Sequence, residues 1–332
     1  MTSTRGGQPG QPAQPGQPAA APSAPTAAGG ASPPGGEAGV EREFTVKART
    51  QTQMVLRRFR QHKLAVASLI VFIIVVLVSF VGGAIWHYKV GQRISDPDYS
   101  ASPSWKHPFG TTNTGEDNMA LVLKGSQRSI EIALFVAFTS TAVGALYGSL
   151  AGLYRGRTDS LMMRFVDVML TFPIIAVAAV LSYNFNANSW FWLAVIISAL
   201  TWPYVSRIVR GVVLSLREKE FIEAARALGA SDRRIIFRHL LPNAMGPIIV
   251  TVTILVATAI LTETALSFIG FGVQFPDTSL GLLVSKAQTA VSTRPWLFYF
   301  PGAFIIIIAL TVNFIGDGLR DAFDPTQTRV RA

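Results

Sequence analysis

One carboxylate, Glu263, lies well inside a long apolar run of this sequence. An acidic side chain is costly at membrane depth, and it usually faces a cavity, a ligand or a polar partner. The carboxylate of Glu263 could bind a cationic group of a ligand. It could equally cap a broken helix near Ser267 and Gly270. The sequence alone leaves both roles open.

The other reactive residue types form no catalytic or metal-binding pattern. The chain has no cysteine, and its four histidines are too dispersed for a zinc cluster. These histidines are His62, His87, His107 and His239. The sequence contains no HExxH or GxSxG motif and no GxxxxGK(S/T) loop. We therefore predict no catalytic residue, no metal site, no directly bound cofactor and no ATP site, so the chain is not expected to be an enzyme.

A charged island, residues 216–242, separates two long apolar runs in the second half of the chain. Its first part is rich in strong helix formers up to Leu228. Gly229 follows, and glycine most easily takes the left-handed conformation that closes a helix. Ser231 and Asp232 can then cap a second helix. The island therefore predicts two short helices joined at Gly229.

One side of the first predicted helix is apolar. Phe221, Ala225 and Leu228 follow one another at spacings of four and three residues, so they share one face. The charged side chains spread over the other faces. A short helix with one apolar side is suited to lie in a groove of a partner.

The elements around the island predict an all-α integral membrane protein with six transmembrane helices. Half of the 332 residues are hydrophobic and only 14% are charged, which is too apolar for an average soluble domain. Six stretches with few or no charges are long enough to cross a bilayer as helices. They are residues 64–86, 132–154, 166–183, 191–209, 245–271 and 297–315.

Small residues and prolines predict how these spans pack. Gly144, Gly148 and Gly152 recur every four residues in the second span. Such a stripe lets helix backbones approach closely, so this face is expected to be buried against a neighbour. Pro173 predicts a kink in the third span, and Pro203 predicts a flexible point in the fourth.

Basic residues predict the orientation of the spans. The segments that would share one side with the island hold 22 lysines and arginines, against seven on the other side. Cytoplasmic loops carry the excess of such residues, so the island and both termini are expected in the cytoplasm. The net charge of +10 follows this topology and no clustered basic face, so no nucleic acid partner is expected.

Composition also divides the chain into segments. Residues 1–40 are rich in proline, glycine and alanine, and they predict a disordered cytoplasmic tail. Residues 41–63 form a basic, amphipathic segment before the first span. Residues 64–128 are expected to hold the first span and an extracytoplasmic loop. Residues 129–325 are expected to form a five-helix transmembrane domain, followed by a short tail, residues 326–332.

The island resembles the EAA loop of bacterial ABC importer permeases. The residues that carry the resemblance are Glu223, Ala224, Ala225, Gly229, Leu241 and Pro242. His239 departs from the pattern, which usually has isoleucine there. The neighbouring DRRIIFRHLLPNAMGPI is similar to the dipeptide, oligopeptide and nickel branch of the family.

Two further segments resemble the second, or C-type, permease of peptide importers. Residues 107–130, HPFGTTNTGEDNMALVLKGSQRSI, are similar to its segment after the first span, with departures at Thr112 and Glu116. Residues 316–325, GDGLRDAFDP, match its C-terminal signature. The resemblance thus covers most of the chain and leaves out the N-terminal tail.

The resemblance implies a type I ABC importer permease architecture, in which the EAA loop is a cytoplasmic coupling helix that docks on an ATPase subunit. The implied docking residues are Glu223, Ala224, Ala225, Arg226, Leu228, Gly229, Ser231 and Asp232. The implied partners are a second homologous permease, two ATPase subunits that hold ATP and Mg, an extracytoplasmic substrate-binding protein and the lipids of the bacterial cytoplasmic membrane. Glu263 would then be a candidate for the substrate pathway.

The implied cargo is a di- or oligopeptide, because peptides are the commonest cargo of this branch. Nickel or another small solute is the alternative, although four dispersed histidines give nickel no support. A channel or secondary transporter outside the ABC family is a second alternative. Such a protein would not need a docking island, and it would be expected to carry more buried ionisable groups than Glu263 and Asp167.

Overall fold

The computed structural model describes residues 51–94, 99–185 and 189–323. Within these ranges every regular element is a helix, and an isolated bridge joins Thr111 to Asp117. The predicted disordered tail, residues 1–40, and the C-terminal tail, residues 326–332, lie outside the described residues. The described part of the chain is therefore all-α.

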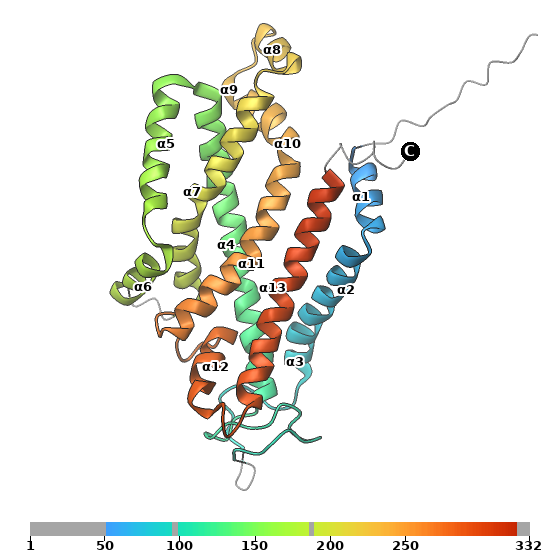
Figure 1. Ribbon diagram of the computed structural model, residues 1–332, viewed down its shortest axis with the longest axis vertical. Coiled ribbons are helices and arrows are strands. Elements are labelled where there is room, and N and C mark those ends of the chain that lie inside the picture. The colour runs from blue at the N-terminus through green and yellow to red at the C-terminus, as the bar shows by residue number, and fades with distance from the viewer. Residues whose placement is uncertain (1–50, 95–98, 186–188, 324–332) are drawn as a thin grey trace, which may run out of the picture. The chain divides into compact units, whose positions relative to one another are not determined.

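Five helices are long and apolar enough to cross a membrane (Figure 1). They are Lys63–Ile85, α4 (Asn118–Tyr154), α7 (Trp190–Leu216), α11 (Met245–Phe268) and α13 (Trp296–Phe323). The first consists of α2 (Lys63–Leu77), the π-helical η1 (Val78–Gly82) and α3 (Gly83–Ile85). This set of apolar helices is that of a multi-pass membrane protein.

The third predicted span, residues 166–183, is a sharply bent pair of helices instead of one kinked helix. It consists of α5 (Gly156–Thr171) and α6 (Ile174–Asn184), bent by 82°. Phe172 is extended, since a residue that precedes proline avoids the helical conformation. The break therefore falls where Pro173 predicted it, but its angle is much larger than that of a kink. The described residues contain five spans, or six if the bent pair is one span.

The second span begins before its apolar stretch, because α4 starts at Asn118, inside the loop expected over 87–128. Asp117 is the N-cap residue, and its carboxylate also accepts a hydrogen bond from the indole of Trp86 at 3.0 Å. His107 lies 2.8 Å from the other oxygen of the same carboxylate. These bonds attach the start of α4 to the end of the first span.

The α4 helix packs along α7 through the predicted glycine stripe. Gly144, Gly148 and Gly152 all face α7. A Cβ atom on Gly144 would lie 2.5 Å from the Cβ of Val205, and one on Gly148 would collide with the main chain of α7. Glycine is needed here because any side chain would force the two helices apart.

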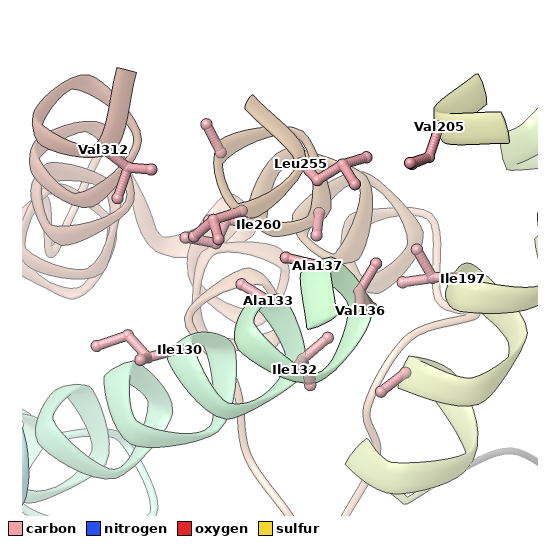
Figure 2. Close-up of a cluster of buried hydrophobic side chains, with 14 of the residues drawn as sticks. Ile130, Ile132, Ala133, Val136, Ala137, Ile197, Val205, Leu255, Ile260 and Val312 are labelled. Carbon is pink, nitrogen blue, oxygen red and sulfur yellow. The ribbon is translucent and has the colours of Figure 1, made fainter. Parts of the chain in front are cut away.

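A hydrophobic core forms where α4, α7, α11 and α13 meet (Figure 2). Ile132, Ile197 and Ile260 are fully buried in it. Since lipid is as apolar as these side chains, close packing between helices stabilises such a core more than removal from water does.

The other spans differ from expectation mainly in length. The α7 helix continues through Pro203, and α13 continues past residue 315 to Phe323. The remaining helices outside the island are α1 (Gln51–Gln61), α12 (Leu280–Ala287) and the 3-10 helix η3 (Gln288–Ala290). The island contains α8 (Glu220–Ala227), α9 (Asp232–Arg234), the π-helical η2 (Ile235–Leu240) and α10 (Leu241–Asn243).

Candidate functional site

The charged island begins where α7 ends, and it is tied there to the end of α4. Arg217 donates hydrogen bonds of 2.7 and 3.1 Å to two carbonyl oxygens in the last turn of α4, which lack partners within their own helix. Burial lowers the pKa of the Arg217 guanidinium, nearby Arg155 and Arg226 lower it further, and Glu218 opposes them. Arg155 also forms an ion pair with Glu218. The ends of α4 and α7 therefore hold each other where the island starts.

The α8 helix turns one face toward the bundle and another outward. Ile222 and Ala225 are buried, whereas Phe221 is 41% exposed and Leu228 is 89% exposed. Ala225, which the spacing places on one face with Phe221 and Leu228, is buried together with Ile222, so it is not exposed as those two residues are. The exposed apolar residues of this segment are Phe221, Ala224, Ala227 and Leu228.

Gly229 ends α8 in the left-handed conformation, with φ of +76°. Its N–H donates to the carbonyl of Arg226 at 2.9 Å, and the N–H of Ala230 donates to the carbonyl of Ala225 at 3.0 Å. These two bonds form a Schellman motif, which satisfies carbonyl groups at the helix end. No atom lies within 4 Å of the position a Cβ would take on Gly229. The backbone conformation therefore favours glycine here, whereas the space around Gly229 would allow a side chain.

The second helix of the island starts at the predicted place but without the predicted cap. Ser231 occupies the N-cap position of α9, yet its side chain makes no capping hydrogen bond. Asp232 is the first residue of α9. Pro242 lies in the first turn of α10, where the missing N–H costs little.

The eight residues expected to dock a partner lie together on the island, and seven of them are exposed. The exposed residues are Glu223, Ala224, Arg226, Leu228, Gly229, Ser231 and Asp232. Ala225 alone of the eight is buried. We call these seven residues together with Phe221 the α8 surface. It combines apolar groups with charges of both signs, as transient interfaces between proteins do.

Two ion pairs join α5 to α7 near the island. The guanidinium of Arg210 bonds both carboxylate oxygens of Asp159, at 2.5 and 2.6 Å. Arg207 forms a second ion pair with Asp167. The two-point pair is the stronger kind, because a planar guanidinium matches a carboxylate geometrically. Neither pair was predicted from the sequence, since the partners lie 51 and 40 residues apart.

Glu263 is fully buried, in contact with other polar groups. One carboxylate oxygen accepts a hydrogen bond from Ser267 at 2.7 Å, and the other accepts one from Ser129 at 3.1 Å. The oxygen of Ser129 also accepts a bond of 3.2 Å from the N–H of Leu280. The cluster therefore joins α4, α11 and α12. These bonds supply a structural role for Glu263, and its place in a substrate pathway stays a hypothesis.

Replacing Glu263 by leucine should destabilise the protein. The change removes the acceptor of two buried hydroxyl groups, and each unsatisfied group costs about 1–3 kcal/mol. Glutamine has nearly the same shape and keeps one oxygen acceptor, so Glu263→Gln should retain most of the stability. The measurement is thermal unfolding of the purified protein in detergent, together with transport. If Glu263→Gln unfolded normally but no longer transported cargo that carries a free amine, this result would favour the pathway role.

Within the described ranges, no group of three or more histidine, aspartate and glutamate side chains could hold a metal ion. Two histidines have local partners instead. His62 accepts a hydrogen bond from the N–H of Ala65 at 3.1 Å, and His107 bonds Asp117. The structure thus assigns these two side chains to helix capping and loop packing.

The family of the chain follows from comparison with known proteins. A family model described as binding-protein-dependent transport system inner membrane component matches residues 144–329. The chain therefore belongs to this family of membrane transport components. A second model, the N-terminal TM domain of oligopeptide transport permease C, matches residues 50–103.

Individual relatives within this family are oligopeptide transport permeases. The chain is 38% identical over 282 residues to the oligopeptide transport system permease protein OppC of Mycobacterium bovis, which covers 84% of this chain and 96% of that relative. It is 38% identical over 286 residues to OppC of Haemophilus influenzae, covering 85% and 91% of the two chains. It is 36% identical over 304 residues to OppC of Bacillus subtilis, covering 88% and 95%. The predicted resemblance to a C-type permease is confirmed.

A solved structure shares the fold. The inward-facing MetNI methionine ABC transporter contains a chain that matches with a TM-score of 0.52 and 18% identity. The match covers 62% of this chain and 97% of that chain. At this identity the likeness concerns the fold alone.

Proposed function

We propose that this chain is a permease subunit of an ATP-driven importer that moves di- or oligopeptides across the bacterial cytoplasmic membrane. Membership of the transport family and relatives named for oligopeptide transport support the proposal. The observation that carries it is the α8 surface, on an exposed short helix that packs on η2 and begins shortly after Arg217, which bonds the end of α4. A passive channel would have no use for such a surface.

In this proposal α8 and the Gly229 turn form the EAA coupling helix, which docks on a separate ATPase subunit. ATP and Mg are held by that subunit, and this chain binds no cofactor itself. Arg217 would pass the movement of α8 to α4, and the pair of Arg210 with Asp159 would pass it to α5. Movement at the docking surface would thereby become rigid-body movement of packed helices.

The complete importer would contain a second homologous permease, two ATPase subunits and an extracytoplasmic substrate-binding protein. The two permeases would enclose a pathway that opens alternately to each side of the membrane. We propose that the chain crosses the membrane six times, with the bent pair of α5 and α6 as one span, and that both termini lie in the cytoplasm. The excess of basic residues on the side of the island supports this orientation.

The proposed division of the chain keeps five segments. Residues 1–40, which lie outside the described residues, are kept as a separate N-terminal segment, and residues 41–63 as a basic segment before the first span. Residues 64–128 hold the first span and the extracytoplasmic loop, although α4 already starts at Asn118. Residues 129–325 form the transmembrane domain, and residues 326–332 a short tail.

Transport by the reconstituted complex tests the proposal. We expect vesicles that contain the chain with its partner permease, ATPase subunits and binding protein to accumulate a labelled peptide only when ATP is supplied. The control is the same complex with an inactivating substitution at the phosphate-binding lysine of the ATPase subunits. Accumulation of nickel without peptide would favour the metal alternative, and ATP-independent flux would favour a channel or secondary transporter.

A further inference from the structure

We propose that a groove between the first span and α4 binds the headgroup of an anionic phospholipid. The groove has a volume of about 490 Å³ and lies where α3 passes the first turns of α4, at the end of the bundle opposite α8 (Figure 1). Trp86 and Tyr88 follow the first span directly at this level. Aromatic residues of this kind gather where lipid headgroups begin. The groove therefore lies at the depth of phosphate groups.

The two walls of the groove are held together tightly. Gln127 of α4 donates a hydrogen bond of 2.6 Å to the carbonyl oxygen of Ser79 in the π-helical segment. A Cβ atom on Gly83 would lie 2.7 Å from the side chain of Gln127, so glycine allows this approach. π-Helical turns inside α-helices occur frequently at functional sites. The groove is thus built by fixed elements on both sides.

Two ammonium groups line the groove, one from each wall. Lys89 donates one hydrogen bond to the carbonyl oxygen of Ala84 at 2.9 Å, and Lys124 donates one to Gln127 at 3.2 Å. An ammonium group carries three protons, so each lysine keeps two for a ligand. Both lysines are positioned by the protein and retain the capacity to bind an anion.

The charges around the groove suit a singly charged ligand. Glu131 also lines it, but its carboxylate already forms an ion pair of 2.6 Å with Arg128. Arg128 also approaches Asp277 on its other side, at 3.3 Å. The lining of two lysines and one glutamate carries a surplus of one positive charge. A phosphodiester carries one negative charge and would neutralise this surplus.

The apolar part of the groove favours a lipid over a free anion. Phe80, Ala84 and Val90 line it together with the lysines. Next to the groove, the first span exposes further apolar side chains, including Val81 and Ile85. A phospholipid can place its phosphate at the lysines and its acyl chains along this apolar surface. A free phosphate ion would leave that surface uncovered.

Native mass spectrometry of the purified complex with its partner subunits tests the inference. We expect phosphatidylglycerol to bind more tightly than phosphatidylcholine, and glycerol 3-phosphate to bind far more weakly than either. Lys89→Gln and Lys124→Gln should each weaken phosphatidylglycerol binding about fivefold, the usual effect of one basic residue near a lipid surface. Lys286→Gln removes an exposed lysine from α12, outside the groove, and should change nothing.

Three results would overturn the inference. Equal retention of phosphatidylglycerol in the wild type and in the double Lys89→Gln, Lys124→Gln variant would show that the lysines do not bind it. Equal binding of phosphatidylcholine would remove the requirement for net charge. Binding by the isolated chain but not by the complex would show that a partner subunit fills the groove. The test does not depend on the transported cargo.

Discussion

Replacing Gly229 by aspartate should leave the protein in the membrane but abolish ATP-dependent peptide uptake. Aspartate tolerates the left-handed conformation better than most residues, so the main change is a negative charge on the α8 surface. The spans on either side are untouched, because no atom lies within 4 Å of the new Cβ. Recovery of the ATPase subunits with the purified chain should fall together with uptake. Both quantities are measured on the same membranes.

Three further variants separate the causes of that loss. Asparagine also tolerates positive φ but carries no charge. Gly229→Asn should therefore keep ATPase recovery and uptake close to those of the wild type. Gly229→Val adds no charge, but a β-branched residue at φ of +76° costs roughly 1 kcal/mol or more, so the end of α8 should be distorted. Leu228→Glu replaces the most exposed apolar side chain of the surface and should act like Gly229→Asp.

Charge reversal at the edge of the surface should have a smaller effect. Glu223 is exposed on α8. Glu223→Lys should only partly reduce the amount of ATPase subunits that co-purify with the chain. Wild-type recovery and uptake in both Gly229→Asp and Leu228→Glu would contradict the assignment of α8 as the coupling helix. The family membership of the chain would not be affected.

Local sequence features predicted the elements whose causes are local. Apolar runs located five spans, Pro173 located the break between α5 and α6, and Gly229 located the end of α8. Each depends on residues that are neighbours in the chain. The start of α4 at Asn118 was not predicted, because it depends on contacts with residues that are distant in the chain. Its first turns contain charged and polar residues such as Lys124, and only contacts with the first span and α12 show them to be packed helix.

The contacts that hold the site together depend on distant residues. The partners of Glu263 include Ser129, which lies 134 residues away, and Arg217 bonds carbonyls more than 60 residues away. Main-chain acceptors carry no sequence signal at all. The sequence also does not show which side of α8 faces the bundle, because Ile222 and Phe221 are both apolar. Only the position of the neighbouring helices decides which of the two is buried.

Replacing Gly148 by leucine should cause the largest loss of folded protein. A Cβ at this position would lie 3.0 Å from the main-chain nitrogen of Arg210 and would also collide with the carbonyl oxygen of Ser206. Main-chain atoms cannot rotate away as a flexible side chain can, so α4 and α7 must separate. Overpacking of a core costs about 1–3 kcal/mol, occasionally more. Separation would also strain the ion pair of Arg210 with Asp159, which holds α5.

The matched control for this change is Gly211→Leu, on the helix that Gly148 contacts. No atom lies within 4 Å of a Cβ on Gly211, and leucine is favoured over glycine inside a helix by roughly 0.8 kcal/mol. We expect Gly211→Leu to match the wild type in membrane abundance, in thermal unfolding in detergent and in uptake. Gly148→Ala should lie between this control and Gly148→Leu. If Gly148→Leu were as abundant and stable as Gly211→Leu, close contact between α4 and α7 would not be needed, and the proposed transfer of movement from α8 through these helices would lose its basis.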